Sequence, residues 1–424
     1  MSADVESGSV GRMKSRRWAY LVLLFLVATS AAADRHVVSI LLEPIRKEFA
    51  LSDTMLGLIT GLGFTLVYST AGLPIARWAD RSDRRVILTI AITIWSTMTI
   101  VCGVVHSVWQ LLIARLGVGL GEAGALPPAQ SLVADFFPPQ ERAQAMALFM
   151  ASAMAGYLLG LVGGAQIASA YGWRTVFIVL GCAGLPLGLI VWSCLPEPRQ
   201  IAGRVAAGQQ EPLSQVFQVI WKKKSLRVII LALILYMYVA YGALIFLPSY
   251  MVRLLGIPLA EAGTAYGMSS AAASFIGIVL GGLVVDRLAR YDRRWLVRAP
   301  GAILLAALPC YLLALTANNM EMFLLFAAIG ELALNAAMPA VYAALHEVCG
   351  SARRATTVAV ASLLAYLFGA GLGPLATGMV SDGLMGTYGP ASLRPALMLA
   401  FMVFLPTAAC LFAAAQSLLI DRED

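Results

Sequence analysis

Two adjacent charged residues, Asp34 and Arg35, lie inside a segment that is otherwise apolar, at residues 18–42. A charged side chain at the centre of a bilayer costs about 2.5–3.5 kcal/mol on insertion scales, so such charges are expected to pair and to face a cavity. Two more charges, Arg115 and Glu122, interrupt another apolar segment. Their spacing of seven residues places them on one helix face about 10 Å apart. If the two helices adjoin, the four charges form one cluster.

This predicted cluster suggests two kinds of chemistry. Arginine holds carboxylate or phosphate groups with a planar fork of N–H donors, so Arg35 and Arg115 predict the binding of an anionic substrate. A buried carboxylate can exchange a proton when a substrate anion competes for its arginine partner, so Asp34, or else Glu122, predicts proton coupling. The alternative is a static network of salt bridges that only holds two helices together.

Other polar residues in apolar segments are further candidates for substrate binding. Glu331 and Asn335 are one helical turn apart and line the opposite wall of the predicted cavity, or else form a packed polar pair. Tyr241 offers a ring face and a hydroxyl to a ligand, or else only packs. His36 adjoins the charged pair as a possible second titrating group, although neighbouring helical residues point about 100° apart.

Transmembrane helices must carry these residues. Of 424 residues, 60% are hydrophobic and only 12% are charged, whereas soluble domains contain about 25% charged residues. Apolar segments of about 20 residues span a bilayer as helices, because lipid offers the backbone no hydrogen-bond partner. The sequence predicts an all-α polytopic membrane protein with 12 transmembrane helices, at residues 18–42, 54–76, 86–105, 108–134, 143–169, 174–195, 228–251, 262–285, 297–317, 321–345, 355–380 and 394–417.

The distribution of Lys and Arg predicts the orientation of these helices. With both termini in the cytoplasm, most basic residues fall in cytoplasmic segments, and the predicted external ones are Arg46, Lys47, Arg174, Arg253 and Arg394. This asymmetry explains the net charge of +7 and gives no support to nucleic-acid binding. The N-terminal run resembles a secretory signal, but its apolar pattern resumes at residue 37, so we expect a retained first helix in the inner (plasma) membrane.

Internal similarity predicts two pseudo-symmetric six-helix bundles. Gly121-Glu122 recurs as Gly330-Glu331 in the second half, and the acid–arginine pair at residues 80–81 recurs at residues 286–287. Between the halves, residues 213–224 form an amphipathic stretch that predicts a helix lying on the inner leaflet, or else a disordered tether. The predicted divisions are a cytoplasmic tail (1–17), the first bundle (18–195), a cytoplasmic linker (196–226), the second bundle (227–417) and a cytoplasmic tail (418–424).

The repeated acid–arginine pairs also predict a cytoplasmic gate. Helix N-termini carry partial positive charge, so Asp80 and Asp286 are expected to bind the N-termini of the eleventh and fifth helices and to latch the halves together. For most of the arginines, the alternative is a solvated cytoplasmic charge. The predicted gate comprises Asp80, Arg81, Arg84, Arg142, Asp286, Arg287 and Arg353.

Several segments resemble the spinster family of the major facilitator superfamily. They are ADR (33–35), LLEPIRKEFALSD (41–53), ADRSDRR (79–85) and the run from 115 to 142, and the likeness is strongest through residues 30–175. The resemblance implies a major facilitator fold that exports lysolipids or sphingosine-1-phosphate-like lipids by alternating access. It also implies that Asp34 and Arg35 form the coupling and substrate pair, with Arg115 and Glu122 as partners.

The resemblance further implies that Asp80, Arg81 and Arg84 form the inner gate, but two positions depart from the usual pattern. The loop glycines of the family are replaced by Ala76 and Asp83. The Gly-Pro signature common in antiporters reads Gly-Leu at 160–161, so it gives no indication of antiport.

These observations predict a monomeric secondary transporter that moves an amphipathic anionic lipid together with protons across the bilayer. We expect no cofactor, no metal and no enzymatic activity, since the chain contains no nucleophile–base pair, phosphate-cradling loop or metal-ligand set. A carrier of small organic anions or drugs is the first alternative. A non-transporting receptor or scaffold is the second, and it would bind its ligand without flux or proton release.

Overall fold

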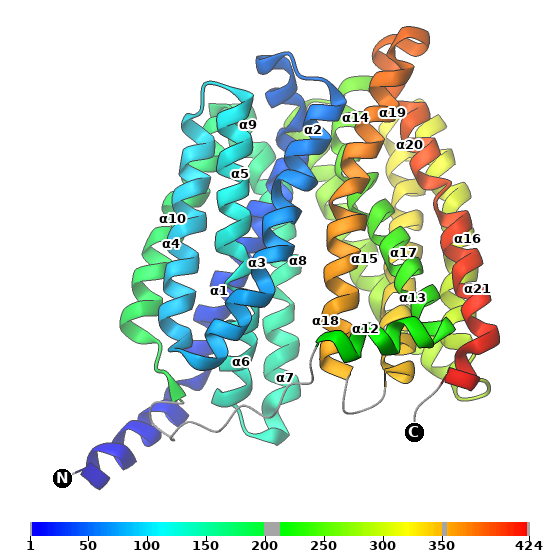
Figure 1. The fold of residues 1–424 in the computed structure, drawn as a ribbon. Coiled ribbons are helices and arrows are strands. Elements are labelled where there is room, and N and C mark those ends of the chain that lie inside the picture. The colour runs from blue at the N-terminus through cyan, green and yellow to red at the C-terminus, as the bar shows by residue number, and fades with distance from the viewer. Residues whose placement is uncertain (1, 199–212, 350–353, 422–424) are drawn as a thin grey trace. The chain divides into compact units, whose positions relative to one another are not determined.

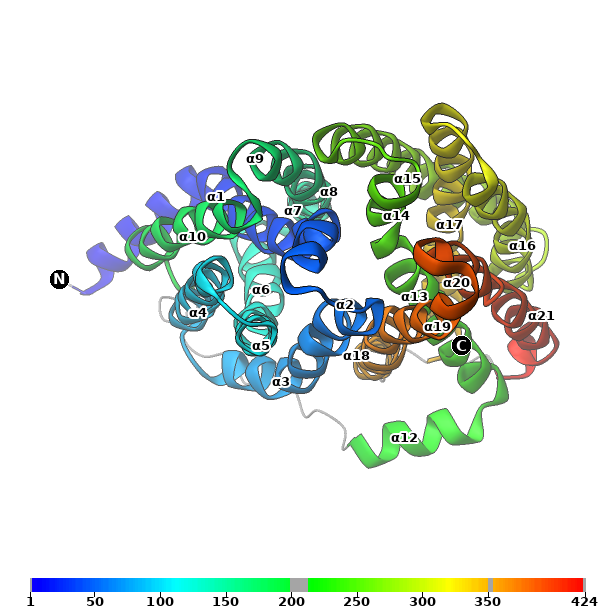
Figure 2. The ribbon, with the colours of Figure 1, turned by 90° about the horizontal axis from the view of Figure 1, so that it is seen from above.

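The computed structural model describes residues 2–198, 213–349 and 354–421 (Figures 1 and 2). Within these ranges every regular element is a helix, as predicted. Contacts divide the chain into two compact units, residues 1–41 with 66–209 and residues 42–65 with 210–424.

The first unit is a bundle of helices that carry the predicted charged cluster. Its elements are α1 (Ser2–Phe49, up to residue 41), α3 (Leu62–Arg81, from residue 66), α4 (Arg84–Val104), α5 (Val108–Ala123), α6 (Leu126–Phe136), α7 (Pro139–Met150), α8 (Ser152–Leu158), the π-helical turn η1 (Leu159–Gly163), α9 (Gly164–Tyr171) and α10 (Trp173–Cys194).

Local sequence explains where several of these helices begin and end. The side chain of Asp83 accepts hydrogen bonds from the backbone N–H groups of Arg85 and Val86 and so caps the start of α4. Ser107 caps α5 in the same way. The predicted span at 108–134 is interrupted between α5 and α6, where Gly124 precedes two prolines that lack an N–H group.

The second unit contains the remaining helices. They are α2 (Asp53–Thr60), α12 (Leu213–Lys222), α13 (Lys224–Gly242), η2 (Leu244–Phe246), α14 (Leu247–Leu254), α15 (Leu259–Ala289), α16 (Trp295–Thr316), α17 (Met320–Val348), α18 (Arg354–Leu364), η3 (Ala365–Ala370), α19 (Leu372–Tyr388), η4 (Gly389–Ser392), α20 (Leu393–Phe401) and α21 (Phe404–Asp421).

The linker contains the predicted amphipathic helix. α12 lies across one end of the second unit, the end that also carries the C-terminal end of α21 (Figure 1). Phe217 and Trp221 are exposed, at 51% and 74%, whereas Ile220 is 9% exposed. Exposed aromatic rings followed by lysines fit a helix that lies at a bilayer surface.

The count of twelve spans is not confirmed. Ten stretches of the described chain are long and apolar enough to cross a membrane. One of these stretches, residues 356–421, is 66 residues long and reverses direction near η4, so α19 and α20 run side by side (Figure 1). α5, with 16 residues, and α6, with 11 residues, are each too short to be counted among these ten stretches. The protein is therefore a multi-pass membrane protein, and the exact number of crossings stays a prediction.

Two helices pass from one unit into the other. α1 crosses the division after residue 41 and α3 crosses it after residue 65, so residues 42–65 group with the second unit although they lie early in the chain. Residues 2–17, expected as a tail, are the beginning of α1. The predicted domain boundaries and the cytoplasmic location of the termini remain predictions.

Candidate functional site

The centre of the first unit brings the charges of α1 and α5 together. Arg35 donates two hydrogen bonds to Oε2 of Glu122, from Nη2 at 2.7 Å and from Nε at 3.1 Å. The Glu122 side chain is fully buried, whereas that of Arg35 is 22% exposed. A buried carboxylate is thus held by an arginine side chain that is partly exposed.

Asp34 and Arg115 complete this cluster. Asp34 is 1% exposed and accepts a hydrogen bond from the hydroxyl of Thr99 on α4 at 3.1 Å. Arg115 is 2% exposed, and Asp34 lies within electrostatic range of both Arg115 and Glu122. We call Asp34, Arg35, Arg115 and Glu122 the central cluster. It contains two carboxylates and two guanidinium groups, so its formal charges balance.

Packing of small and aromatic residues positions the central cluster. A Cβ atom at Gly121 would lie 2.5 Å from the backbone nitrogen of Trp95, so only glycine lets α5 approach α4 this closely beside Glu122. The guanidinium of Arg35 lies 5.1 Å from the centre of the Tyr68 ring, a cation–π arrangement. His36 makes an edge-on contact with the ring of Tyr157, at 4.9 Å between centroids.

Each carboxylate of the central cluster has one buried oxygen without a hydrogen-bond partner among the described residues. These atoms are Oε1 of Glu122 and Oδ1 of Asp34. Because buried polar atoms are normally hydrogen-bonded, both carboxylates are only partly satisfied by the described side chains. A role of the cluster in binding an anion or a proton remains a prediction.

The other predicted substrate residues lie in the second unit. Glu331 is 5% exposed and accepts hydrogen bonds from the hydroxyls of Ser270 at 2.9 Å and Tyr311 at 3.1 Å. Asn335 donates to the hydroxyl of Ser274 and to the backbone carbonyl of Glu331, both at 3.0 Å.

The ring of Tyr241 lies 5.7 Å from that of Tyr366, with 3.5 Å between the two hydroxyls. A role for Glu331, Asn335 and Tyr241 in lining the wall of a substrate cavity remains a prediction.

One predicted gate residue, Arg84, is held inside the first unit. Its side chain is 1% exposed and forms ion pairs with the buried Glu197, which follows α10, and with Asp135 on α6 at 2.7 Å. It also donates to the hydroxyl of Ser131 at 2.7 Å. Neither acid was predicted as a partner of Arg84 from the sequence. A signal was available, because each lies at the end of an apolar helix where an arginine can reach it.

The remaining gate residues lie at the surface or outside the described part. Arg81, Arg142 and Arg287 are exposed. Asp286 is also exposed and lies 4.0 Å from Arg290, one turn away on α15. Arg353 and the side chain of Asp80 lie outside the described residues. The latch between the two halves therefore remains a prediction.

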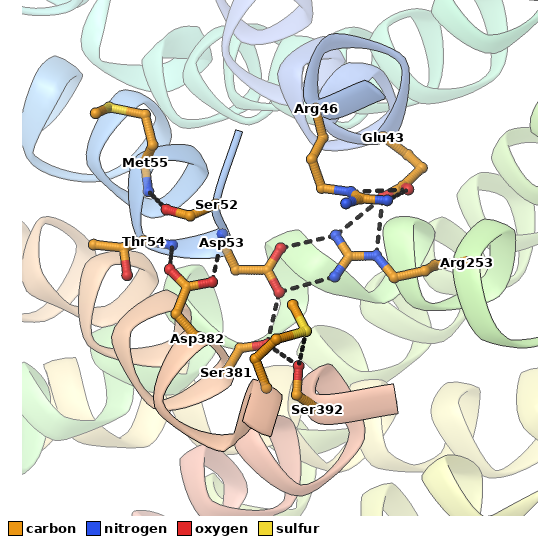
Figure 3. Close-up of polar contacts among 11 residues, drawn as sticks. Glu43, Arg46, Ser52, Asp53, Thr54, Met55, Arg253, Ser381, Asp382 and Ser392 are labelled. Atoms are coloured by element: carbon orange, nitrogen blue, oxygen red, sulfur yellow. Dashed lines mark hydrogen bonds and ion pairs between the residues drawn. The ribbon is translucent and has the colours of Figure 1, made fainter. Parts of the chain in front are cut away.

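A second buried ionic network, which was not predicted from the sequence, lies in the second unit (Figure 3). Arg253 on α14 donates to both carboxylate oxygens of Asp53, each at 2.8 Å, and to Oε2 of Glu43 at 3.1 Å. Glu43 also accepts from Arg46 at 2.6 Å. The side chains of Arg253, Asp53 and Glu43 are 6%, 1% and 2% exposed. Arg46 and Arg253 were predicted from the sequence only as external charges.

Polar groups of α19 complete this network. The carboxylate of Asp382 accepts hydrogen bonds from the backbone N–H groups of Asp53 at 2.9 Å and Thr54 at 2.8 Å. The hydroxyl of Ser381 donates to Asp53 at 2.6 Å. Asp382 therefore binds the N-terminus of α2, where backbone N–H groups have no partner within the helix.

Comparison with known proteins finds relatives that match nearly the whole chain. An "MFS-type efflux pump" of Mycolicibacterium smegmatis is 32% identical, over 94% of this chain and 92% of that protein. Crystal structures of a bacterial homologue of the human lysosomal transporter Spinster match with a TM-score of 0.86 in the inward-facing unoccupied conformation and 0.84 in the inward-facing occupied one. These structures are 30% and 29% identical and cover 96% of this chain and 98% of theirs.

These matches confirm the resemblance to the spinster family that the first half of the sequence predicted. The model of the Major Facilitator Superfamily matches residues 24–374, which include helices of both units and the whole central cluster. The chain belongs to the Major Facilitator Superfamily of membrane transporters.

Proposed function

We propose that this transporter moves an amphipathic anionic lipid, a lysophospholipid or a sphingosine-1-phosphate-like molecule, by alternating access and with proton coupling. The observation that carries the proposal is the ion pair between the partly exposed Arg35 and the fully buried Glu122. Arg35 takes the anionic head group, and the apolar walls expected of such a cavity take the acyl chain. The resemblance to the spinster family supports a lipid as substrate.

Charge balance in the central cluster explains the proposed coupling. Two guanidinium groups offset two carboxylates when no substrate is bound. Entry of an anionic head group adds negative charge, and a buried site tolerates this poorly. Protonation of one carboxylate, Asp34 first and Glu122 second, restores neutrality. Each elementary charge brought in by the head group thus corresponds to one proton bound at the cluster.

The proposal includes a cellular setting and an oligomeric state. The predicted distribution of basic residues supports a bacterial inner membrane with both termini in the cytoplasm. The protein acts as a monomer, since each chain carries both halves of the transport fold. Glu331, Asn335 and Tyr241 contribute to the substrate cavity from the second unit.

A carrier of small organic anions or drugs is the second candidate. The M. smegmatis relative, whose name is "MFS-type efflux pump", favours it. Both candidates use Arg35 for an anionic group, so the acyl chain distinguishes them. Affinity that rises with the length of the acyl chain supports the lipid carrier, and affinity that is indifferent to chain length supports the second candidate.

Transport into proteoliposomes tests the proposal directly. Uptake of labelled lysophospholipids of graded chain length is measured with and without an imposed proton gradient. The variants are wild type, Asp34→Asn and Glu141→Gln. Glu141 is the matched control, because it pairs with Arg17 at 2.9 Å in the same unit but is 35% exposed.

We expect the gradient to stimulate flux in wild type and in Glu141→Gln and to have no effect in Asp34→Asn. Flux that ignores the gradient in wild type would contradict proton coupling. Gradient-driven flux that persists in Asp34→Asn would instead move the coupling site away from Asp34. Absence of lipid flux together with transport of short-chain organic anions would overturn the lipid substrate.

A further inference from the structure

The amphipathic helix α12 lies at the edge of the second unit. In the view from above it lies outside the cluster of long helices of its unit (Figure 2), and its main contacts are with α13 and α18. In a bilayer, phospholipid head groups therefore face most of this helix. Phe217 and Trp221 are one turn apart and expose their rings, and such rings are favoured at the membrane interface.

Hydrogen bonds to two other helices fix the bend between α12 and α13. Lys223, the residue at the bend, donates from Nζ to the carbonyl oxygen of Val348 at the end of α17, at 2.8 Å. The backbone N–H and the hydroxyl of Ser225 donate to Asp421 at the end of α21, at 2.8 and 2.7 Å. The residues on either side of Lys223 thus have fixed backbone positions.

Three exposed cations surround this bend, and we call them the bend cations. Lys222 ends α12, Lys224 begins α13, and Arg227 lies one turn further along α13. The guanidinium of Arg227 lies 5.6 Å from the centre of the Trp221 ring, so a cation–π contact joins the outer surfaces of the two helices. No acidic residue of the described chain forms an ion pair with a bend cation. Positive charge is therefore concentrated here without an acidic partner.

We propose that the bend cations form a binding site for the phosphate of an anionic phospholipid, which the leaflet on the α12 side supplies. Lys222, Lys224 and Arg227 bind the phosphate, and the rings of Phe217 and Trp221 lie among the ester groups of the same leaflet. This lipid is a component of the bilayer and is not transported. The inference depends on neither the lipid substrate nor the proton coupling of the proposed function.

Charge complementarity selects an anionic head group at this site. Phosphatidylcholine carries a cation beside its phosphate, whereas phosphatidylglycerol keeps a net negative charge. Each basic residue close to an anionic membrane surface strengthens binding about fivefold. Salt screens the attraction between exposed charges, so the affinity for phosphatidylglycerol should fall as ionic strength rises.

Native mass spectrometry of the full-length protein in a non-ionic detergent tests the site, because it counts bound lipids directly. Phosphatidylglycerol and phosphatidylcholine with the same acyl chains are titrated separately. The triple variant Lys222→Ala, Lys224→Ala and Arg227→Ala removes the bend cations. Arg290→Ala is the matched control, because the Arg290 side chain is 80% exposed in the same unit but is paired with Asp286.

We expect wild type and Arg290→Ala to bind phosphatidylglycerol more tightly than phosphatidylcholine. Each single substitution of a bend cation should raise the Kd of phosphatidylglycerol about fivefold, and the triple variant should raise it about 100-fold. Trp221→Leu removes the ring beside Arg227 without changing the charge, so it should raise this Kd about two- to fivefold. The Kd of phosphatidylcholine should stay nearly unchanged in the charge variants.

The melting temperature provides a second measurement. A ligand that binds only the folded state raises it. Phosphatidylglycerol should therefore raise the melting temperature of wild type and Arg290→Ala above that in phosphatidylcholine, and it should not do so in the triple variant. Gel filtration and melting without added lipid identify variants that fail to fold.

Equal affinities for phosphatidylglycerol in wild type and the folded triple variant would overturn the inference. An equal loss in Arg290→Ala would also overturn it, since the attraction would then be unspecific. Loss of the bound lipid in Arg35→Ala but not in the triple variant would place that lipid in the central cluster, with the same consequence. Failure of lipid uptake in proteoliposomes would leave these Kd values unchanged, so the two proposals fail separately.

Discussion

Replacing Glu122 by glutamine should make the transporter bind anionic ligands more tightly. Arg35 donates two hydrogen bonds to a single oxygen of Glu122, at 2.7 and 3.1 Å. A ligand anion must displace this carboxylate before it can bind Arg35. Glu122→Gln keeps the shape of the side chain but removes the competing charge, so the arginine becomes more available to the ligand.

The size of the effect follows from the contacts. Hydrogen bonds to charged groups contribute about 1.5–3 kcal/mol net to stability. We count one such contribution, because both bonds end on one oxygen and Arg35 is 22% exposed. Each 1.4 kcal/mol corresponds to about tenfold in affinity, so the upper range is about 100-fold. The amide oxygen of glutamine still accepts a hydrogen bond from Arg35, which favours the lower end, about tenfold.

The assay is equilibrium binding in detergent, with a lysophosphatidic acid as anionic ligand and a monoacylglycerol of the same chain length as neutral ligand. Glu122→Gln should lower the Kd of the anion about tenfold and leave that of the neutral lipid nearly unchanged. Glu141→Gln should change neither. An anion Kd that is unchanged or higher in folded Glu122→Gln would refute the idea that substrate and Glu122 compete for Arg35.

Three further predictions concern stability, measured as the free energy of unfolding. Arg84→Ala leaves the buried Glu197 without its main ion pair, so we expect a loss of about 3–5 kcal/mol; a loss below that of a typical surface substitution would contradict the buried pair. Gly281→Ala should destabilise the protein by about 1–3 kcal/mol, because its methyl group would overlap a backbone carbonyl, whereas Gly282→Ala, with nothing within 4 Å, should be neutral or slightly stabilising. Equal effects at the two glycines would argue against the close helix contact. Tyr311→Phe removes the 3.1 Å hydrogen bond to a buried carboxylate and should cost about 1–3 kcal/mol; an unchanged melting temperature would show that this bond contributes nothing.

The sequence alone predicted the class of fold and the residues of the central cluster. Long apolar segments can only be helical in lipid, and charges within them must find partners. These two constraints act locally, so Asp34, Arg35, Arg115 and Glu122 could be selected without coordinates. The family resemblance supplied the adjacency of the two helices that carry them.

The partners of other charges depended on which helices adjoin, and hydropathy does not encode that. The gate role of Arg84 stays a prediction, but its buried partner Glu197, which is 113 residues away, was not predicted. Arg253 was predicted only as an external charge, and its partner Asp53, which is 200 residues away, was not predicted either. The two members of such a pair are far apart in the sequence, and many acidic residues lie in similar local sequences. The sequence therefore does not show which acid pairs with which arginine.

The amino-acid sequence thus determined that this chain crosses a membrane as helices and that Arg35 and its neighbours must be compensated inside it. The tertiary structure decided which acid compensates which arginine, that Asp382 binds the N-terminus of α2, and that residues 42–65 group with the second unit. The physical reason is that burial is specified by composition along each helix, whereas pairing is specified by the contacts between helices.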